Sequence, residues 1–141
     1  MKQITKRLKP GEDLRVEIEK LVKDNNARAG VVLSLVGSLS KASLRMADGK
    51  TVKSWNEPFE IVAATGTVSV NGCHIHISVA DNEGNVFGGH LKEGCAVKTT
   101  AEAVLLIFED AIYKRIPDKE TGYNELEAEL HENLQENTGY N

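Results

Sequence analysis

The sequence has few cysteines and no long apolar run, and each shortage excludes a class of protein. Its 141 residues include only Cys73 and Cys95, which are too few for a disulfide framework, so we expect both thiols to be reduced. The longest apolar run, residues 103–108, is too short to span a membrane. The first residues also lack the apolar segment of a secretory signal. We therefore expect a cytoplasmic protein that has no membrane partner.

Positive charge is scarce as well. The chain has 17 lysines and arginines against 21 acidic residues, and its formal net charge is −4. Strong sequence-independent binding of nucleic acid depends on many lysine and arginine contacts with phosphates. The composition therefore disfavours that function, although it is ordinary for a soluble single domain with a core of its own.

The common sequence signatures of nucleotide-binding and serine-hydrolase sites are absent. There is no GxGxxG segment after a strand, no Walker A sequence and no GxSxG nucleophile elbow. Any chemistry must therefore come from another set of residues.

The spacing of apolar residues predicts one helix and otherwise strands. Leu14, Ile18, Leu21 and Val22 recur at helical spacing, between an acidic start at residues 12–13 and an end at residues 24–26. Strands are expected over residues 30–36, 42–46, 59–70, 86–91, 103–108 and 112–116, and after the turn at residues 71–72.

Three details of these elements carry further expectations. Gly37 and Ser38 are expected to break the strand that precedes them, and Gly66 to mark a bulge or bend. From residue 118 the sequence is acidic and polar. We expect a domain of residues 1–117 and a flexible tail of residues 118–141, in which a short helix over residues 125–134 is one option.

Three of the four histidines, His74, His76 and His90, lie within one short segment. Alternate residues of a strand share a face, so His74 and His76 point the same way. A three-residue loop over residues 82–84, with Gly84 in the left-handed conformation, pairs residue 81 with 85 and therefore 76 with 90. A two-residue loop would put His90 on the other face, and a bulge at residues 88–89 would disturb the pairing.

With the three-residue loop, the three imidazoles converge on one point. His74, His76 and His90 then form an open divalent metal site with room for water or substrate. Three neutral imidazoles suit Zn²⁺ first, then Ni²⁺, Fe²⁺ or Mn²⁺. The alternative is that these histidines are ordinary surface or hydrogen-bonded residues. Cys73 faces away from them, His131 lies in the polar tail, and no catalytic residue is identified.

An ordered series of segments covers nearly the whole chain, from residue 1 to residue 116. Its members are residues 36–39 (VGSL), 42–45 (ASLR), 59–61 (FEI), 66–68 (GTV), 72–78 (GCHIHIS), 88–91 (GGHL) and 94–102 (GCAVKTTAE). This series resembles the plants-and-prokaryotes-conserved (PPC) domain. The resemblance implies an α+β fold, with a strongly curved, mostly antiparallel sheet and one main N-terminal helix, and a homotrimer. It also implies kinship with acetolactate decarboxylase, whose zinc-binding pattern corresponds only to His74, His76 and His90 here.

DNA is a further partner that the resemblance raises. The plant members are nuclear proteins whose AT-hook motifs enter the minor groove. This chain has no AT-hook, and its short basic segments, residues 2–7 and 114–115, are better explained as solvated strand edges. We therefore expect any DNA binding to be weak.

Three functions stay open after the sequence. The first is a metal-binding protein that binds or converts a small carbonyl or carboxylate ligand at the three histidines. The second is a DNA-associated regulator that acts through its oligomeric surface, and the third is a structural trimer whose histidines only stabilise the fold. A cupin barrel is the alternative fold, but the usual cupin glutamate is missing because Glu83 lies at the tip of the turn.

Overall fold

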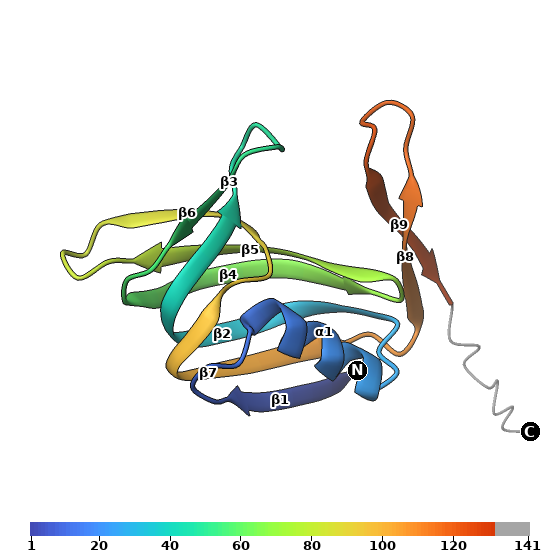
Figure 1. The fold of residues 1–141 in the computed structure, drawn as a ribbon. Helices are drawn as coiled ribbons and strands as arrows, with labels where there is room; N and C mark the ends of the chain where they lie inside the picture. Colours follow the sequence, from blue (N-terminus) through green and yellow to red (C-terminus); the bar gives the residue numbers. More distant parts are fainter. Residues whose placement is uncertain (132–141) are drawn as a thin grey trace, which may run out of the picture.

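One curved antiparallel sheet dominates the computed structural model, which describes residues 1–131 (Figure 1). Its strands are β1 Lys2–Leu8, β2 Ala29–Arg45, β3 Val52–Trp55, β4 Phe59–Ser69, β5 Gly72–Ala80, β6 Val86–Leu91 and β7 Ala96–Ile107. Two further strands, β8 Ala111–Pro117 and β9 Asn124–Leu130, form a separate two-stranded sheet. The expected α+β fold with a mostly antiparallel sheet is confirmed.

The large sheet bends until it meets itself. Its strands follow the order β1-β7-β2-β4-β5-β6, and β3 pairs with β2 outside this path. β2 is 17 residues long. It pairs with β4 and β7 along most of its length, while its last residues, Leu44 and Arg45, pair with Leu91 and His90 of β6. This pairing brings the end of β2 directly beside the histidine-bearing hairpin.

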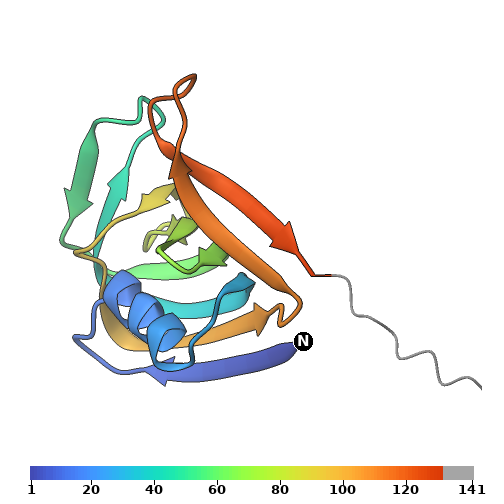
Figure 2. The same cartoon turned by 90° about the vertical axis from the view of Figure 1, so that its right-hand side faces the viewer.

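The helix α1 Leu14–Asp24 packs over β1 and β7 (Figure 2). Asp13 caps its first turn by accepting a hydrogen bond from the Val16 amide at 3.1 Å. Leu14, Ile18 and Val22 recur on one face and are buried in the core. The helix therefore forms where the spacing predicts it. It is not long and apolar enough to cross a membrane, and it is the one helix that the described residues contain.

The predicted break at Gly37 is wrong, because β2 runs through this position without interruption. A Cβ atom on Gly37 would lie 2.2 Å from the Thr100 carbonyl oxygen of β7. The glycine therefore permits two backbones to approach closely, and the pairing of β2 with β7 shifts register just after it.

The expected flexible tail is also wrong for the part of it that the structure describes. Residues 124–130 form β9 and pair along their whole length with β8, so the helix suggested over residues 125–134 is absent from residues 125–130. The rest of that helix and residues 132–141 lie outside the described residues. The short basic segments do lie on edge strands, since β1 ends the large sheet and residues 114–115 lie on β8 of the two-stranded sheet.

Candidate metal centre

β5 positions two of the three histidines by strict alternation. Its odd-numbered residues from 73 to 79 point into the core, and its even-numbered residues point to the opposite face. The buried side chains are Cys73, Ile75, Ile77 and Val79. A slip of one residue would expose all four and bury His74 and His76 instead, so the apolar pattern fixes where the histidines point.

The turn after β5 brings in the third histidine. The Asp81 amide donates to the Asn85 carbonyl at 3.0 Å, and the Gly84 amide donates to the Asp81 carbonyl at 3.0 Å. Gly84 has a φ of 82°, and the Asp81 carboxylate also accepts hydrogen bonds from two amides of the loop. The loop therefore has the predicted three residues, and His76 pairs with His90 as predicted.

Two glycines let β6 fit beside its neighbours. A Cβ atom on Gly88 would lie 2.3 Å from the Ile77 carbonyl oxygen of β5, and one on Gly89 would lie 2.6 Å from the Arg45 carbonyl oxygen of β2. No bulge forms at these positions, since the pairing of β5 with β6 continues without a shift.

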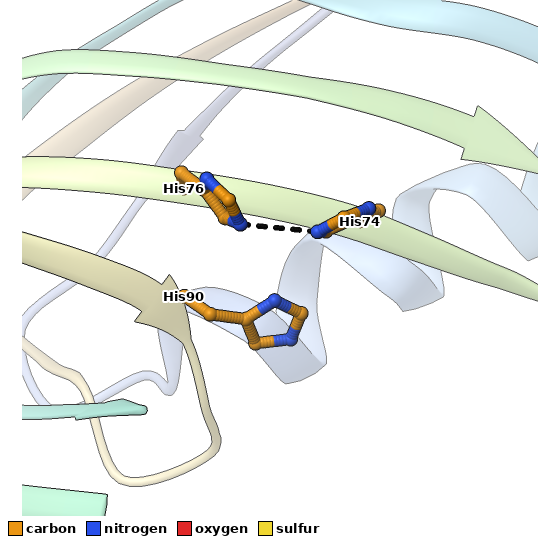
Figure 3. Close-up of side chains that lie close together, drawn as sticks. All are labelled: His74, His76 and His90. Carbon is orange, nitrogen blue, oxygen red and sulfur yellow. Dashed lines mark hydrogen bonds between the residues drawn. The ribbon is translucent and has the colours of Figure 1, made fainter. Parts of the chain in front are cut away.

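The three imidazoles come together on this face of the sheet (Figure 3). Nε2 of His74 lies 3.0 Å from Nε2 of His76, and one potential donor nitrogen from each residue lies within 4.8 Å of the others. The His90 ring centroid lies 5.0 Å from that of His74 and 5.5 Å from that of His76. The predicted convergence is therefore confirmed.

Two arginines hold the third ring from either side. Nη1 of Arg15, on α1, lies 3.5 Å from Nε2 of His90, and Nη2 of Arg45, on β2, lies 3.5 Å from Nδ1. Arg15 is itself fixed by a hydrogen bond to the Leu91 carbonyl at 2.7 Å and by an ion pair with Glu19 at 2.9 Å. A neutral imidazole has one acceptor nitrogen, so it can accept from only one of the two guanidinium groups.

The surroundings keep two of the rings neutral. Burial, followed by the charge of Arg45, lowers the pKa of His90 from 6.5 to about 4. Burial, followed by His76, also lowers the pKa of His74 below its ordinary value. Neutral imidazole is the form that coordinates metal ions, so both rings are ready to act as ligands near neutral pH.

The donor set fits a divalent ion. A tetrahedral zinc ion bound at about 2.0–2.1 Å places two imidazole nitrogens roughly 3.3 Å apart, close to the His74–His76 spacing. That contact needs a proton on one of the two nitrogens, and a cation can take the place of this proton. His74, His76 and His90 are therefore the residues that would hold such an ion.

Two other candidate ligands stay outside the cluster. Burial raises the pKa of the Cys73 thiol to about 11, so it stays protonated in the core and is a poor ligand. His131 is exposed beyond the end of β9.

A cavity of about 300 Å³ adjoins the cluster, and four of its eleven lining residues come from a segment that sequence reasoning did not place there. On one side it is bounded by His74, His90 and the two arginines beside His90. On the other side it is bounded by Arg115 of β8 and by Tyr123, Asn124 and Glu125. Those residues were assigned to a strand edge and to a polar tail, and only the long-range packing of the β8–β9 hairpin brings them here.

Comparison with known proteins gives one family. The family described as the Plants and Prokaryotes Conserved (PCC) domain matches residues 1–109. The bifunctional protein GlmU of Synechococcus sp. (strain JA-3-3Ab) is 46% identical over 123 residues, which cover 87% of this chain. The chain spans about a fifth of the length of that relative, since the match covers 20% of it.

Solved structures share the fold. A protein from Salmonella has 32% identity and a TM-score of 0.88, with 92% of this chain and 94% of that chain covered. A metal-containing protein from Archaeoglobus fulgidus has 27% identity and a TM-score of 0.76, and the match covers 89% of this chain and 92% of that protein.

Proposed function

Because this chain belongs to the Plants and Prokaryotes Conserved domain family, we propose that it is a metal-binding protein with a site at His74, His76 and His90. The convergence of three imidazoles from two paired strands carries the proposal. The metal content of the Archaeoglobus relative supports it.

Zinc is the metal we propose. Imidazole suits zinc, and a set of three protein ligands that leaves a position open is typical of catalytic and ligand-binding zinc sites rather than of structural ones. When bound, such an ion supplies a Lewis acid that polarises a carbonyl or acidifies a water molecule.

The chain's own groups would orient a ligand there. The ion would have to be approached from the face that carries the histidines, where the cavity beside His74 and His90 holds a small molecule at most. We propose a small carbonyl or carboxylate compound as that ligand. Arg15, positioned by Glu19 and the Leu91 carbonyl, lines the His90 side of the cavity.

A purely structural role for the histidines has less support. None of the three belongs to the hydrophobic core, and His76 is exposed. Side chains that stabilise a fold by packing are buried, whereas these face the cavity and solvent.

Metal analysis of the untagged protein tests the proposal directly. The protein is stripped with a chelator, dialysed and titrated with Zn²⁺. We expect one zinc ion per chain, and a chain that binds none would refute the metal site.

A further inference from the structure

The second wall of the cavity suggests what the ligand carries. We propose that the cavity beside the histidines binds a compact dianionic group, a phosphate monoester or a dicarboxylate, through Arg45 and Arg115. The inference rests on the proposed function only for the position of the metal. The arginines and their surroundings argue for the anion independently.

Three guanidinium groups line this small cavity, and within residues 1–131 only that of Arg15 has a counter-ion. Arg15 is paired with Glu19 at 2.9 Å. Within residues 1–131, neither Arg45 nor Arg115 has a carboxylate oxygen within 4.0 Å. Glu125 also lines the cavity, but its carboxylate accepts a hydrogen bond from the Thr121 hydroxyl at 2.9 Å and forms no ion pair there.

Arg45 is the more deeply placed of the two. Its Nε atom is buried and has no hydrogen-bond partner among the described residues. A buried donor on a charged group is costly when it has no partner, and a guanidinium can satisfy two of its donors with one carboxylate or phosphate. The Tyr123 ring lies 5.8 Å from the Arg45 guanidinium carbon and covers one side of this group.

Arg115 is held in place by its backbone rather than by an acid. The Asn71 side chain donates to the Arg115 carbonyl at 2.8 Å and accepts from the Arg115 amide at 2.7 Å. The guanidinium donates to the Thr67 hydroxyl, on the residue that pairs with His74 across β4 and β5. Among the described residues the guanidinium makes no other hydrogen bond, and it lines the same cavity as His74 and His90.

The charge count favours two negative charges on the ligand. Arg15 is balanced by Glu19, and Glu125 offsets one of the two positive charges of Arg45 and Arg115, so the lining carries one net positive charge. A divalent ion at the histidines raises this charge to three, and one carboxylate would leave two of the three unbalanced. A cavity lined mainly by positive charge attracts anions to it. The volume of about 300 Å³ is at the small end of known ligand sites, so the ligand must be compact.

The β8–β9 hairpin supplies part of this pocket from residues that lie outside the family match. The match ends at residue 109, whereas Arg115, Tyr123 and Glu125 follow it. In Figure 2 the tip of this hairpin reaches across to the turn between β2 and β3. We infer that ligand selection depends on the hairpin, while metal binding depends on the family domain.

Calorimetric titration with inorganic phosphate, malonate and acetate tests the proposal. Each anion is titrated into the zinc-loaded and the chelator-stripped protein. We expect phosphate or malonate to bind at least tenfold more tightly than acetate, and to keep measurable affinity for the stripped protein. Tighter phosphate binding indicates a phosphate monoester and tighter malonate binding a dicarboxylate, and either order supports the proposal.

Three variants locate the site. Arg115→Met and Arg45→Met should each weaken dianion binding by roughly tenfold or more, because each removes charge-assisted hydrogen bonds. Lys114→Met is the matched control: it removes the same charge from the same strand, but Lys114 pairs with Glu129 and does not line the cavity. Thermal melting beside the wild type confirms that each variant is folded.

The two proposals fail separately. Zinc binding without preference for dianions would overturn the anion site alone, as would an equal loss in Lys114→Met and Arg115→Met. Dianion binding that needs Arg115 in a protein that takes up no zinc would overturn the metal proposal alone.

Discussion

Replacing His76 by alanine is the sharpest test of the metal centre. Zinc sites with four ligands are worth about 10–16 kcal/mol, so each ligand contributes about 2.5–4 kcal/mol on average. The loss of one ligand should therefore weaken zinc affinity by roughly 50- to 1,000-fold. The fold should persist, because His76 is exposed and lies outside the core. We expect a cost of about 1 kcal/mol or less, seen as a melting shift of a few degrees.

The assay is a competition titration of stripped protein against a chromophoric zinc chelator, with metal content and thermal melting measured on the same samples. His131→Ala is the matched control, because His131 is exposed and does not belong to the cluster. If His76→Ala kept the zinc affinity of the wild type and the control, His76 would not be a ligand. If it unfolded, the site would be structural and our reasoning about an open site would be refuted.

Three further predictions concern assembly, DNA and β6. We expect a homotrimer, which the family resemblance implies and which could bury the exposed apolar side chains of Leu33, Val36 and Val62. The mass in solution should then be three times 15.4 kDa, and the mass of a single chain at micromolar concentration would contradict the prediction. The Kd for duplex DNA should be above about 1 μM near 150 mM salt, because the net charge of the chain is −4. A lower Kd with a steep salt dependence, measured by titration with duplex DNA, would contradict this prediction. Gly88→Ala should destabilise the protein by about 1–3 kcal/mol and weaken zinc binding, because the added Cβ would press on the Ile77 carbonyl and displace β6. Denaturant unfolding measures the loss of stability. A variant as stable as the wild type would show that β6 has room for a side chain.

The histidine cluster could be predicted because its determinants are local. Alternation fixes the face of β5, and the Asp81–Gly84 hydrogen bond and the positive φ of Gly84 fix the loop length. These interactions join residues only a few positions apart, so the sequence contains the whole argument. The helix was predictable for the same reason, since spacing and a cap suffice.

The rest of the site could not be predicted because long-range contacts build it. In β9 the acidic Glu125, Glu127 and Glu129 alternate with the apolar Leu126, Ala128 and Leu130, which is the spacing of a strand. This local signal was missed because the segment is acidic overall, whereas its pairing with β8 and its place beside the cavity depend on long-range contacts. Arg115 reaches the cavity through Asn71, which lies 44 residues earlier. Gly37 looked like a break because a close approach between β2 and β7 and a turn both favour glycine.

The pairing of β2 with β6 has a consequence for the order of folding. His76 and His90 are joined by a short hairpin, and hairpins of this kind form in about 1–10 μs. Arg45 meets His90 only across a separation of 45 residues, and closing such a long loop costs more chain entropy and is slower. We therefore expect the three imidazoles to come together before Arg45 reaches His90. Zinc added during refolding can then bind to the newly formed hairpin and can speed the later pairing of β2 with β6.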